Sequence, residues 1–341
     1  FDDEIMSQSS PGKKKWVCFD EIHKMPKWKD ILKDFFDSFE QRYQFIVTGS
    51  ARLDLFRRSG DSLAGRYFTF HLNPICLREF IGNVKKNQEP RKPLDFIMSR
   101  IERAVYKQKE LNELLALSGF PEPLNKGTAR FYVKWHRDYL DRIVREDMRD
   151  LTKIMNLENI FALMHMLPQR VGSPLSINSL SNDMLLGYKV VRNLIHALEL
   201  MFMVFLIRPW HKRINRSIRK EPKLYFYDWT HIKDESLLYE NFMAMELKNM
   251  VDIWSDNGYG DFNLFYVRTK DGKETDFLIT KYHMPWLLCE AKLKSAKIES
   301  HHYRISELLG NIPFVQIVKE DKITQQRDKI FFQVSASRFF L

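Results

Sequence analysis

The sequence is poor in cysteine and contains no long apolar run, and both shortages exclude classes of protein. Its 341 residues include three cysteines, each far from the others and set in an apolar stretch: Cys18, Cys76 and Cys289. This odd, scattered set argues against a disulfide framework and favours a reducing, cytoplasmic location. The longest apolar run, residues 200–207, is far shorter than the roughly 20 residues that span a bilayer, so we expect no membrane partner.

Hydrophobic and basic residues, by contrast, are plentiful. A hydrophobic content of 44% with 13% aromatics is enough to bury real cores, which rules out wholesale disorder. At about 150 residues per domain, the length predicts two to three domains. Lysine and arginine number 54 against 44 acidic residues, a net charge of +10. This excess favours a polyanionic partner such as DNA or a nucleotide.

The N-terminal part predicts a parallel sheet covered by helices. Residues 16–19 and 45–47 are short apolar runs typical of buried strands, and residues 27–41 carry apolar side chains at helical spacing. Strand, helix and strand in this order, with continuously apolar strands, indicate parallel pairing with both faces buried. We expect a further strand at residues 67–72.

Polar residues follow the first two strands at their carboxyl ends. Asp20 and Glu21 come directly after the first strand, and Ser50 follows the second. In an ATPase, an Asp in this place helps to hold Mg²⁺, the Glu polarises the attacking water and a hydroxyl residue senses the terminal phosphate. We therefore take Asp20 and Ser50 as candidate ligands of Mg²⁺ and ATP, and Glu21 as a candidate catalytic residue. Arg66 either supplies a charge-stabilising finger or makes an ordinary surface ion pair.

Five sequence blocks follow one another in the first 122 residues of the chain. They are residues 16–28 (WVCFDEIHKMPKW), Thr48-Gly49-Ser50, Leu63-Ala64-Gly65-Arg66, Arg78-Glu79-Phe80 and Ser118-Gly119-Phe120-Pro121-Glu122. Their order and spacing resemble a large bacterial and archaeal family of AAA-type ATPases whose C-terminal domain has no known function. The resemblance implies an enzyme that uses ATP and Mg²⁺. It also implies a homo-oligomer if Arg66 reaches a neighbouring subunit.

One element of such an ATPase is missing from the sequence. A phosphate-binding P-loop has the pattern G-x-x-x-x-G-K-[ST] and precedes the Walker B strand by several dozen residues. No stretch fits this pattern, and nineteen residues precede Asp20. Either the P-loop stands on a segment before these residues, or the chain holds a nucleotide weakly. In both cases we expect the chain alone to hydrolyse ATP poorly.

Residues 176–201 predict a helix-turn-helix. Ser176 is a candidate N-cap, Leu186-Gly187 predicts a turn, and a helix follows over residues 188–201. One face of this second helix is polar, and the opposite face is expected to be core. The polar face carries Lys189, Arg192 and Asn193, and the core face Val190, Leu194, Leu198 and Met201.

A basic stretch follows this second helix. Its cationic residues include Arg208, Lys212, Arg213, Arg216 and Arg219. In the family the segment resembles a winged helix, with the basic stretch in the place of the wing. We expect these residues, together with Lys189, Arg192 and Asn193, to contact DNA phosphates. The alternative is a winged helix that serves as a spacer with a solvated basic face.

The C-terminal part contains a pattern typical of metal-dependent nucleases. Asp276 ends one predicted strand, and Glu290-Ala291-Lys292 lies on the next, with Glu290 and Lys292 on one face. The two carboxylates are suited to hold Mg²⁺, and the lysine to orient or deprotonate a water. Glu240, on a preceding predicted helix, is a fourth candidate metal ligand. The set resembles the PD-(D/E)xK restriction-endonuclease motif, with Thr275 in place of the proline.

The sequence as a whole predicts an α/β protein of four parts. These are the C-terminal part of an AAA-like P-loop ATPase domain with a parallel sheet (1–84), a helical insert or lid (85–155), a winged helix (156–222) and a restriction-endonuclease-like α/β domain (223–341). We expect an ATPase that acts on DNA through the last two parts. Two alternatives remain: an ATPase-switched protein-interaction module whose nuclease fold does not cleave, and a DNA-binding regulator without enzyme activity.

Overall fold

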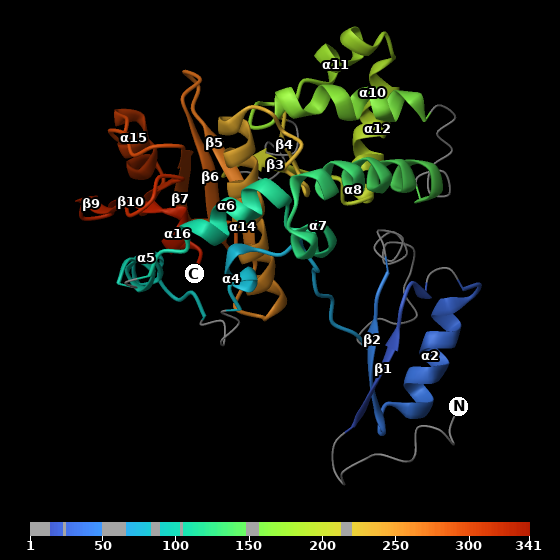
Figure 1. Cartoon of the computed structure of the whole chain (residues 1–341). Helices are drawn as coiled ribbons and strands as arrows, with labels where there is room; N and C mark the ends of the chain where they lie inside the picture. Colours follow the sequence, from blue (N-terminus) through green and yellow to red (C-terminus); the bar gives the residue numbers. More distant parts are fainter. Residues whose placement is uncertain are drawn as a thin grey trace. The chain divides into compact units, whose positions relative to one another are not determined.

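The computed structural model in Figure 1 describes most of the chain. Described are residues 14–22, 25–49, 66–82, 89–102, 105–147, 157–212 and 220–341. Four predicted site residues lie outside these ranges: Ser50, Arg213, Arg216 and Arg219. The chain divides into two compact units, residues 1–69 and 70–341, and each is described by itself.

The first unit contains the predicted strand, helix and strand. Strand β1 (Lys15–Phe19) pairs in parallel with β2 (Tyr43–Val47), and helix α2 (Trp28–Phe39) connects them. Phe19 of β1 stacks on Phe45 of β2, with 6.1 Å between the ring centroids, and meets Phe35 of α2 edge-on. These aromatic contacts hold the helix on one face of the strand pair.

The prediction that both faces of these strands are buried is wrong for the described residues. Exposed and half-buried side chains alternate along β1 and β2. On the exposed face Trp16 has 63% of its surface accessible and Ile46 43%. Because side chains alternate between the two faces of a strand, helix α2 covers one face, and Trp16 and Ile46 on the other face stay exposed.

The second unit is a mixed α/β fold built around one large sheet. Its helices in the described residues are α4 (Leu77–Phe80), α5 (Pro93–Ile101), α6 (Gln108–Leu117), α7 (Pro121–Lys126), α8 (Ala129–Arg142), the π-helical turn η2 (Ile143–Asp147), α10 (Glu158–Met166), the 3₁₀ turn η3 (Leu167–Arg170), α11 (Ile177–Met184), α12 (Tyr188–Leu200), α14 (Glu235–Asp256), α15 (Ser300–Leu308) and α16 (Ala336–Phe339). Its strands there are β3 (Val204–Pro209), β4 (Lys223–Phe226), β5 (Phe262–Arg268), β6 (Glu274–Lys281), β7 (Met284–Lys292), β8 (Phe314–Val318), β9 (Thr324–Asp328) and β10 (Phe331–Ser335). Within these segments we find no helix of the length and apolarity that crossing a membrane requires.

The sheet of the second unit has the strand order β4-β3-β5-β6-β7-β8-β10-β9. Strands β5, β6 and β7 form an antiparallel meander, and β8 lies parallel to β7. Strand β3 pairs in parallel with β5 and antiparallel with β4, so the strands that follow α12 extend the C-terminal sheet.

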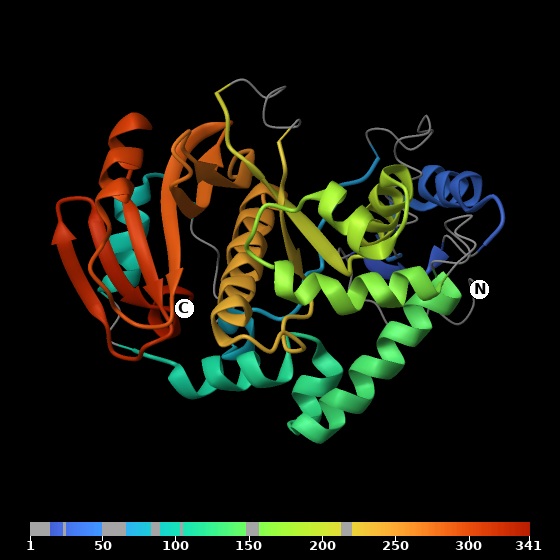
Figure 2. The ribbon, with the colours of Figure 1, turned by 90° about the horizontal axis from the view of Figure 1, so that it is seen from above.

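Helix α14 covers one face of this sheet (Figure 2). It begins where it does because the side chain of Asp234 accepts hydrogen bonds from the backbone N–H groups of Ser236 and Leu237, at 2.9 and 3.0 Å. The helix packs against β4, β5 and β7, and seven consecutive residues in its middle, 241–247, are buried. Helix α15 packs against β6 in a separate apolar cluster, which contains Leu278 and Leu288.

Most predicted C-terminal elements are confirmed. From the sequence, strands are predicted at residues 262–268, 275–280, 286–290 and 313–318, and helices at residues 236–250 and 299–309. The strands correspond to β5, β6, β7 and β8, and the helices to α14 and α15. Helix α14 extends six residues beyond its predicted end, to Asp256.

Two other stretches differ from the prediction. The sequence predicts three short helices over residues 157–206, but residues 204–206 belong to strand β3. This strand lies between β4 and β5 and is therefore apolar on both faces. Residues 67–72, predicted as a strand, have no strand partner in the described ranges. The backbone N–H of His71 donates instead to a carboxylate oxygen of Asp256, at 2.7 Å.

The two helices of the predicted helix-turn-helix are present. Ser176 caps α11 with its side chain, and α12 begins directly after Gly187. Three of the four predicted core residues are buried: Leu194 and Leu198 on α12, and Met201 directly after its end. The fourth was wrong, because Val190 is 44% exposed and the neighbouring Val191 is buried in its place.

Gly119, from the glycine-proline block, lies where distant segments of the second unit meet. Its carbonyl oxygen accepts a hydrogen bond from the backbone N–H of Ile75 at 2.7 Å. A Cβ on Gly119 would lie 2.7 Å from the Ile75 carbonyl oxygen and 2.9 Å from the Trp229 ring. Trp229 is itself held by a hydrogen bond from its indole N–H to the carbonyl of Leu114, at 3.1 Å. The position therefore has no room for a side chain.

We expect Gly119→Ala to lower the free energy of unfolding by about 1–3 kcal/mol, the usual cost of overpacking a closed site. Urea denaturation followed by circular dichroism measures it. Gly187→Ala is the matched control, since a Cβ there meets open space; its cost as a weaker N-cap should stay below about 1 kcal/mol. Equal effects of the two substitutions would contradict the packing argument.

Candidate functional site

Two adjacent strands place Asp276 beside Glu290. In the antiparallel register of β6 and β7, Phe277 lies opposite Cys289, so the next pair along is Asp276 and Glu290. The backbone N–H of Asp276 donates to Glu290 Oε2 at 3.2 Å. The backbone N–H of Ala291 donates to Asp276 Oδ2 at 3.1 Å. Each carboxylate is therefore oriented by the backbone of the opposite strand.

Lys292 completes the predicted cluster. It lies two residues after Glu290 on β7, so the two side chains point to the same side of the strand. Its ammonium lies 2.9 Å from Glu290 Oε1, and its side chain is 41% exposed, whereas Glu290 is buried. Thr275, which replaces the proline of the motif, is buried and hydrogen-bonds to Nδ1 of His302 at 2.8 Å. The structure thus brings Asp276, Glu290 and Lys292 together.

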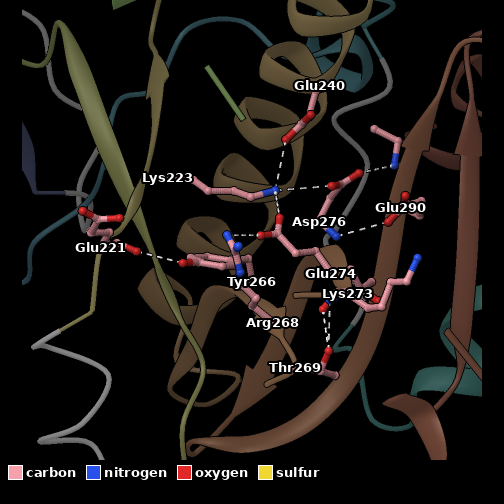
Figure 3. A network of polar contacts seen from close by, with 12 residues as sticks. Glu221, Lys223, Glu240, Tyr266, Arg268, Thr269, Lys273, Glu274, Asp276 and Glu290 are labelled. Atoms are coloured by element: carbon pink, nitrogen blue, oxygen red, sulfur yellow. Dashed lines mark hydrogen bonds and ion pairs between the residues drawn. The ribbon is translucent and has the colours of Figure 1, made fainter. Parts of the chain in front are cut away.

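A buried lysine, Lys223, lies among the carboxylates (Figure 3). It is the first residue of β4 and is 1% exposed. Its ammonium lies 3.4 Å from Asp276 and 3.5 Å from Glu240. It also lies 3.3 Å from Glu274, which makes a second ion pair with Arg268 at 2.8 Å. One ammonium is therefore shared by three carboxylates from two elements.

Helix α14 presents Glu240 to this ammonium because the next residue fixes the helix to strand β4. The Asn241 side chain accepts from the backbone N–H of Phe226 and donates to its carbonyl, both at 2.8 Å. Glu240 accepts a hydrogen bond from the Tyr225 hydroxyl at 2.8 Å. Gly172 lies so close that a Cβ there would be 2.6 Å from both carboxylate oxygens of Glu240. The fourth predicted metal ligand is thus part of the cluster.

Burial and mutual repulsion shift the acidic groups of the site. Burial raises the pKa of Glu240 to about 7, with repulsion from Asp276 adding to the shift and Lys223 opposing it. Burial and Asp276 likewise raise the pKa of Glu290 to about 8. Burial alone would lower the pKa of Lys223, but attraction to Glu240, Asp276 and Glu274 outweighs it and raises that pKa. The lysine therefore stays charged while Glu240 and Glu290 take up protons near neutral pH.

Lys223, Glu274 and Tyr225 are the site residues that sequence reasoning missed. One signal was available for Glu274, because it precedes Asp276 by two residues on the same strand and so shares its face. Lys223 directly follows a basic stretch and resembles one more solvated cation in the sequence. Its contacts with positions 240, 274 and 276 join segments that local spacing does not relate.

In the first unit, the carboxyl ends of β1 and β2 bring Asp20 close to Thr48. The Thr48 hydroxyl donates to Asp20 Oδ1, and the Thr48 hydroxyl oxygen accepts from the backbone N–H of Glu21 at 3.4 Å. Arg66 pairs with Asp37 of α2 at 3.0 Å, which is the surface ion pair named above as the alternative to a finger. Ser50 lies outside the described residues, so its place beside Asp20 stays a prediction.

The described part of the predicted DNA-binding set is exposed. Lys189, Arg192 and Asn193 lie on the exposed face of α12, and Lys212 is exposed beyond the end of β3. The remaining predicted contacts, Arg213, Arg216 and Arg219, lie outside the described ranges. The basic face on α12 has the position that the sequence predicted for it, and its role in binding DNA stays a prediction.

Two family descriptions match parts of the chain. Residues 1–81 match the family described as "AAA domain", and residues 108–230 match the "Domain of unknown function (DUF8612)". The first match supports the resemblance to AAA-type ATPases for the segment that contains Asp20 and Glu21. The second covers the helices from α6 to α12 together with β3 and β4.

Curated relatives are similar over much of the chain. Uncharacterized protein MJ1544 of Methanocaldococcus jannaschii is 26% identical over 281 residues, which cover 77% of this chain and 58% of the relative. Uncharacterized protein MJ1637 of the same organism is 25% identical over 222 residues, 62% of this chain and 46% of the relative. Uncharacterized protein Rv2008c of Mycobacterium tuberculosis is 20% identical over 283 residues, which cover 79% of this chain and 57% of the relative. The chain thus spans about half the length of these relatives.

Among solved structures, a chain from the complex of Thermococcus gammatolerans McrB AAA+ hexamers with bound McrC is 11% identical and covers 94% of both chains. Its TM-score of 0.20 is too low to indicate a shared fold.

We expect the free energy of unfolding of the metal-free protein to fall as pH rises from about 5 to about 8. Glu240 and Glu290 have folded-state pKa values of about 7 and about 8, above the ordinary 4.5. The folded chain therefore binds more protons than the unfolded chain in this window, and loses that stabilisation as the protons leave. Glu246, buried against the backbone N–H of Leu77, has a pKa raised to about 8 and acts in the same direction.

Urea denaturation in EDTA at several pH values measures this slope. Glu290→Gln should flatten part of it, because the amide does not titrate, and Glu246→Gln a further part. A stability that rises over the same window in the wild type would contradict the assignment.

Proposed function

We propose that the second unit carries a divalent-metal site of the PD-(D/E)xK restriction-endonuclease type, and that an AAA-type ATPase part works with it on DNA. One observation supports this most strongly. Asp276, Glu290 and Lys292 lie together on adjacent strands, and Glu240 contacts the same ammonium as Asp276. Residues that were chosen from a sequence motif therefore form one cluster of carboxylates and a lysine, which supports the proposed metal site.

The strand order around the site is consistent with a restriction-endonuclease-like fold. Helix α14 is followed by the antiparallel meander β5, β6 and β7, then by α15 and by β8, which returns parallel to β7. Asp276 and Glu290 lie on β6 and β7, the two middle strands of this sheet, and Glu240 lies on α14, which packs against β4, β5 and β7. The position places the cluster on rigid elements rather than on loops.

The side chains fit a hard divalent cation such as Mg²⁺ or Mn²⁺. Asp276, Glu290 and Glu240 would hold it, because carboxylate oxygens are the ligands that these ions prefer. Lys223 supports the fit, since its ammonium is a cation already bound by Asp276 and Glu240. When bound, such an ion supplies Lewis-acid activation of a phosphate oxygen and of a water molecule.

Lys292 is the residue best placed to handle the water. Its ammonium is anchored by Glu290, and part of its side chain reaches solvent. It would orient the water against a phosphodiester and help to stabilise the developing negative charge. In the hydrolysis the water oxygen bonds to phosphorus, the bond from phosphorus to the leaving oxygen breaks, and that oxygen takes up a proton. Asp276 is fixed by a hydrogen bond from the backbone of β7, and it would keep its carboxylate close to Glu290 and Lys292.

Lys223 favours a second candidate function, in which the unit acts as an interaction module that does not cleave. Its ammonium neutralises three carboxylates and is almost completely buried, so it fills the electrostatic role of a metal ion. If no ion displaces it, the ATPase part would switch a binding surface rather than a nuclease. In a DNA-binding regulator without enzyme activity, the same unit would also not cleave, and its partner would be DNA instead of a protein.

DNA binding is proposed for the segment from α10 to β4. Three helices, α10, α11 and α12, precede the antiparallel pair of β3 and β4, an order that fits a winged helix. The exposed Lys189, Arg192 and Lys212 lie on the second helix of the motif and at the base of the wing. Contacts of this kind with phosphates position a protein on DNA without reading its sequence.

ATP is proposed to bind through the first unit, with Asp20 and Glu21 serving Mg²⁺ and water. The "AAA domain" match over residues 1–81 supports this part. A homo-oligomer in which Arg66 reaches a neighbouring subunit's nucleotide would require its ion pair with Asp37 to open. We propose that these parts act together in the cytoplasm.

Calorimetric titration with Mn²⁺ tests the metal site. We expect the wild type to bind and Asp276→Asn to lose binding. Lys223→Met should bind at least about tenfold tighter, or about 1.4 kcal/mol, because a positive charge among the ligands repels the ion. Lys248→Met is the matched control, since that lysine pairs with Asp252 on α14 and should not affect the ion. Equal heats from the wild type and Asp276→Asn would remove the metal site from the proposal.

Plasmid DNA incubated with Mn²⁺ under the same conditions distinguishes the two candidate functions. Nicking that disappears in Lys292→Ala supports the nuclease. Metal binding without nicking, in the wild type and in Lys223→Met alike, supports the interaction module.

We expect duplex DNA binding to be independent of sequence and steeply dependent on salt. Five or six phosphate contacts give a slope of log K against log[salt] of about −5. Replacing Lys189, Arg192 and Lys212 with Ala should weaken binding and reduce that slope by up to about 2.7, at about 0.9 per contact. The control triple variant changes three exposed cations of α8, Arg130, Lys134 and Arg137, to Ala. If both triple variants lose affinity equally, net charge rather than the winged helix accounts for binding.

A further inference from the structure

A second cluster of potential metal ligands lies outside the carboxylate site. His136 of α8, together with Asp228 and His231 of the segment after β4, offers three ligand atoms that all lie within 4.8 Å of one another. Nδ1 of His136 is 2.7 Å from Asp228 Oδ2, and the two histidine rings stack with 4.8 Å between their centroids. Two imidazoles and a carboxylate therefore converge from two separate elements.

His231 has buried polar atoms without a well-formed hydrogen bond in the described chain. Both of its ring nitrogens are buried, and neither makes a hydrogen bond of good geometry to a described residue, although the ring interacts with the backbone of Asp228. A buried polar group left unpaired loses its hydration without compensation, so such groups are rare and need an explanation. A metal ion bound to one nitrogen would supply the missing partner.

The charge of the cluster also suits a cation. Burial alone would raise the pKa of Asp228, but hydrogen bonding to His136 and attraction to the histidines hold it below its usual range, so the carboxylate is ionised. Burial lowers the pKa of His231 to about 4, so at neutral pH the ring is uncharged and has a free lone pair. An anionic oxygen beside a neutral imidazole is the state in which these groups bind a metal.

The space beside the cluster leaves room for one more ligand. A small cavity of about 10 Å³ is lined by His136, Asp228 and His231 and otherwise mainly by apolar side chains, among them Phe120 and Met164. This is the room that about one water molecule needs. Three protein ligands with one open position is the arrangement of many zinc sites, and an apolar surround keeps the ligands from competing water.

We propose that His136, Asp228 and His231 form a binding site for a divalent transition-metal ion of the zinc class. Imidazole nitrogens favour such ions over Mg²⁺, which separates this site from the all-oxygen cluster at Asp276. A tetrahedral ion with bonds of about 2.0–2.1 Å holds its ligand atoms about 3.4 Å apart. His136 Nδ1 and Asp228 Oδ2, which lie 2.7 Å apart, must therefore separate and exchange their hydrogen bond for bonds to the ion when it binds. The bound ion joins helix α8 to the segment after β4.

Equilibrium dialysis against Zn²⁺, with the metal measured by mass spectrometry, tests this proposal on the purified full chain. The protein is first treated with a chelator, and excess Mg²⁺ is present to occupy the carboxylate cluster. We expect one zinc per chain in the wild type, and binding at least about 100-fold weaker in His231→Phe and in His136→Gln. His283→Phe, which changes a histidine stacked on Trp210 instead, should retain the zinc.

Two comparisons make the outcome decisive. Asp276→Asn should keep its zinc, which shows that the ion is not in the carboxylate cluster and that this site stands independently of the proposed nuclease. Zinc should also raise the melting temperature of the wild type but not of His136→Gln, a variant that keeps a hydrogen-bonding group beside Asp228. A wild type that binds no zinc, or a folded His231→Phe or His136→Gln that binds one equivalent as tightly, would overturn the proposal.

Discussion

The shared ammonium of Lys223 is the interaction on which the C-terminal site depends. It ties the start of β4 to helix α14 through Glu240 and to strand β6 through Glu274 and Asp276. Removing one partner from such a buried set typically costs about 3–5 kcal/mol, because the remaining charges stay buried without compensation. The carboxylates are thus gathered in the folded chain before any external ion arrives.

The function of the site therefore depends on whether a divalent metal ion can displace the Lys223 ammonium from the carboxylates. An ion that enters must offset the loss of three ion pairs to Lys223, and the lysine must find another place for its charge. Burial, with repulsion from Asp276, raises the pKa values of Glu240 and Glu290, so a divalent ion that binds these two carboxyls must also displace their protons. The balance between these costs and the attraction of the ionised carboxylates for the ion decides between a nuclease and a module that only binds.

The parts predictable from the sequence were those governed by short-range rules. Strand β5 was predicted at its true bounds. Motif spacing identified Asp276, Glu290 and Lys292, since a strand relates residues two apart and a meander relates neighbouring strands. Strand β3 was missed because an inner strand that is apolar on both faces resembles the helix before it. Lys223 and the pair of His136 with Asp228 were missed for another reason. Their contacts join segments that only the tertiary fold relates.

The side-chain amide of Asn241 has a further consequence for how the second unit meets other proteins. Strand β4 lies at one end of the sheet, where free backbone groups invite a strand from another chain. Asn241 occupies both backbone groups of Phe226, and Pro174 bridges to Lys223 at the other end of the strand. The edge is thereby closed to β-augmentation, and the opposite edge, β9, is polar (TQQRD). Growth of this sheet by added strands is thus disfavoured at both ends.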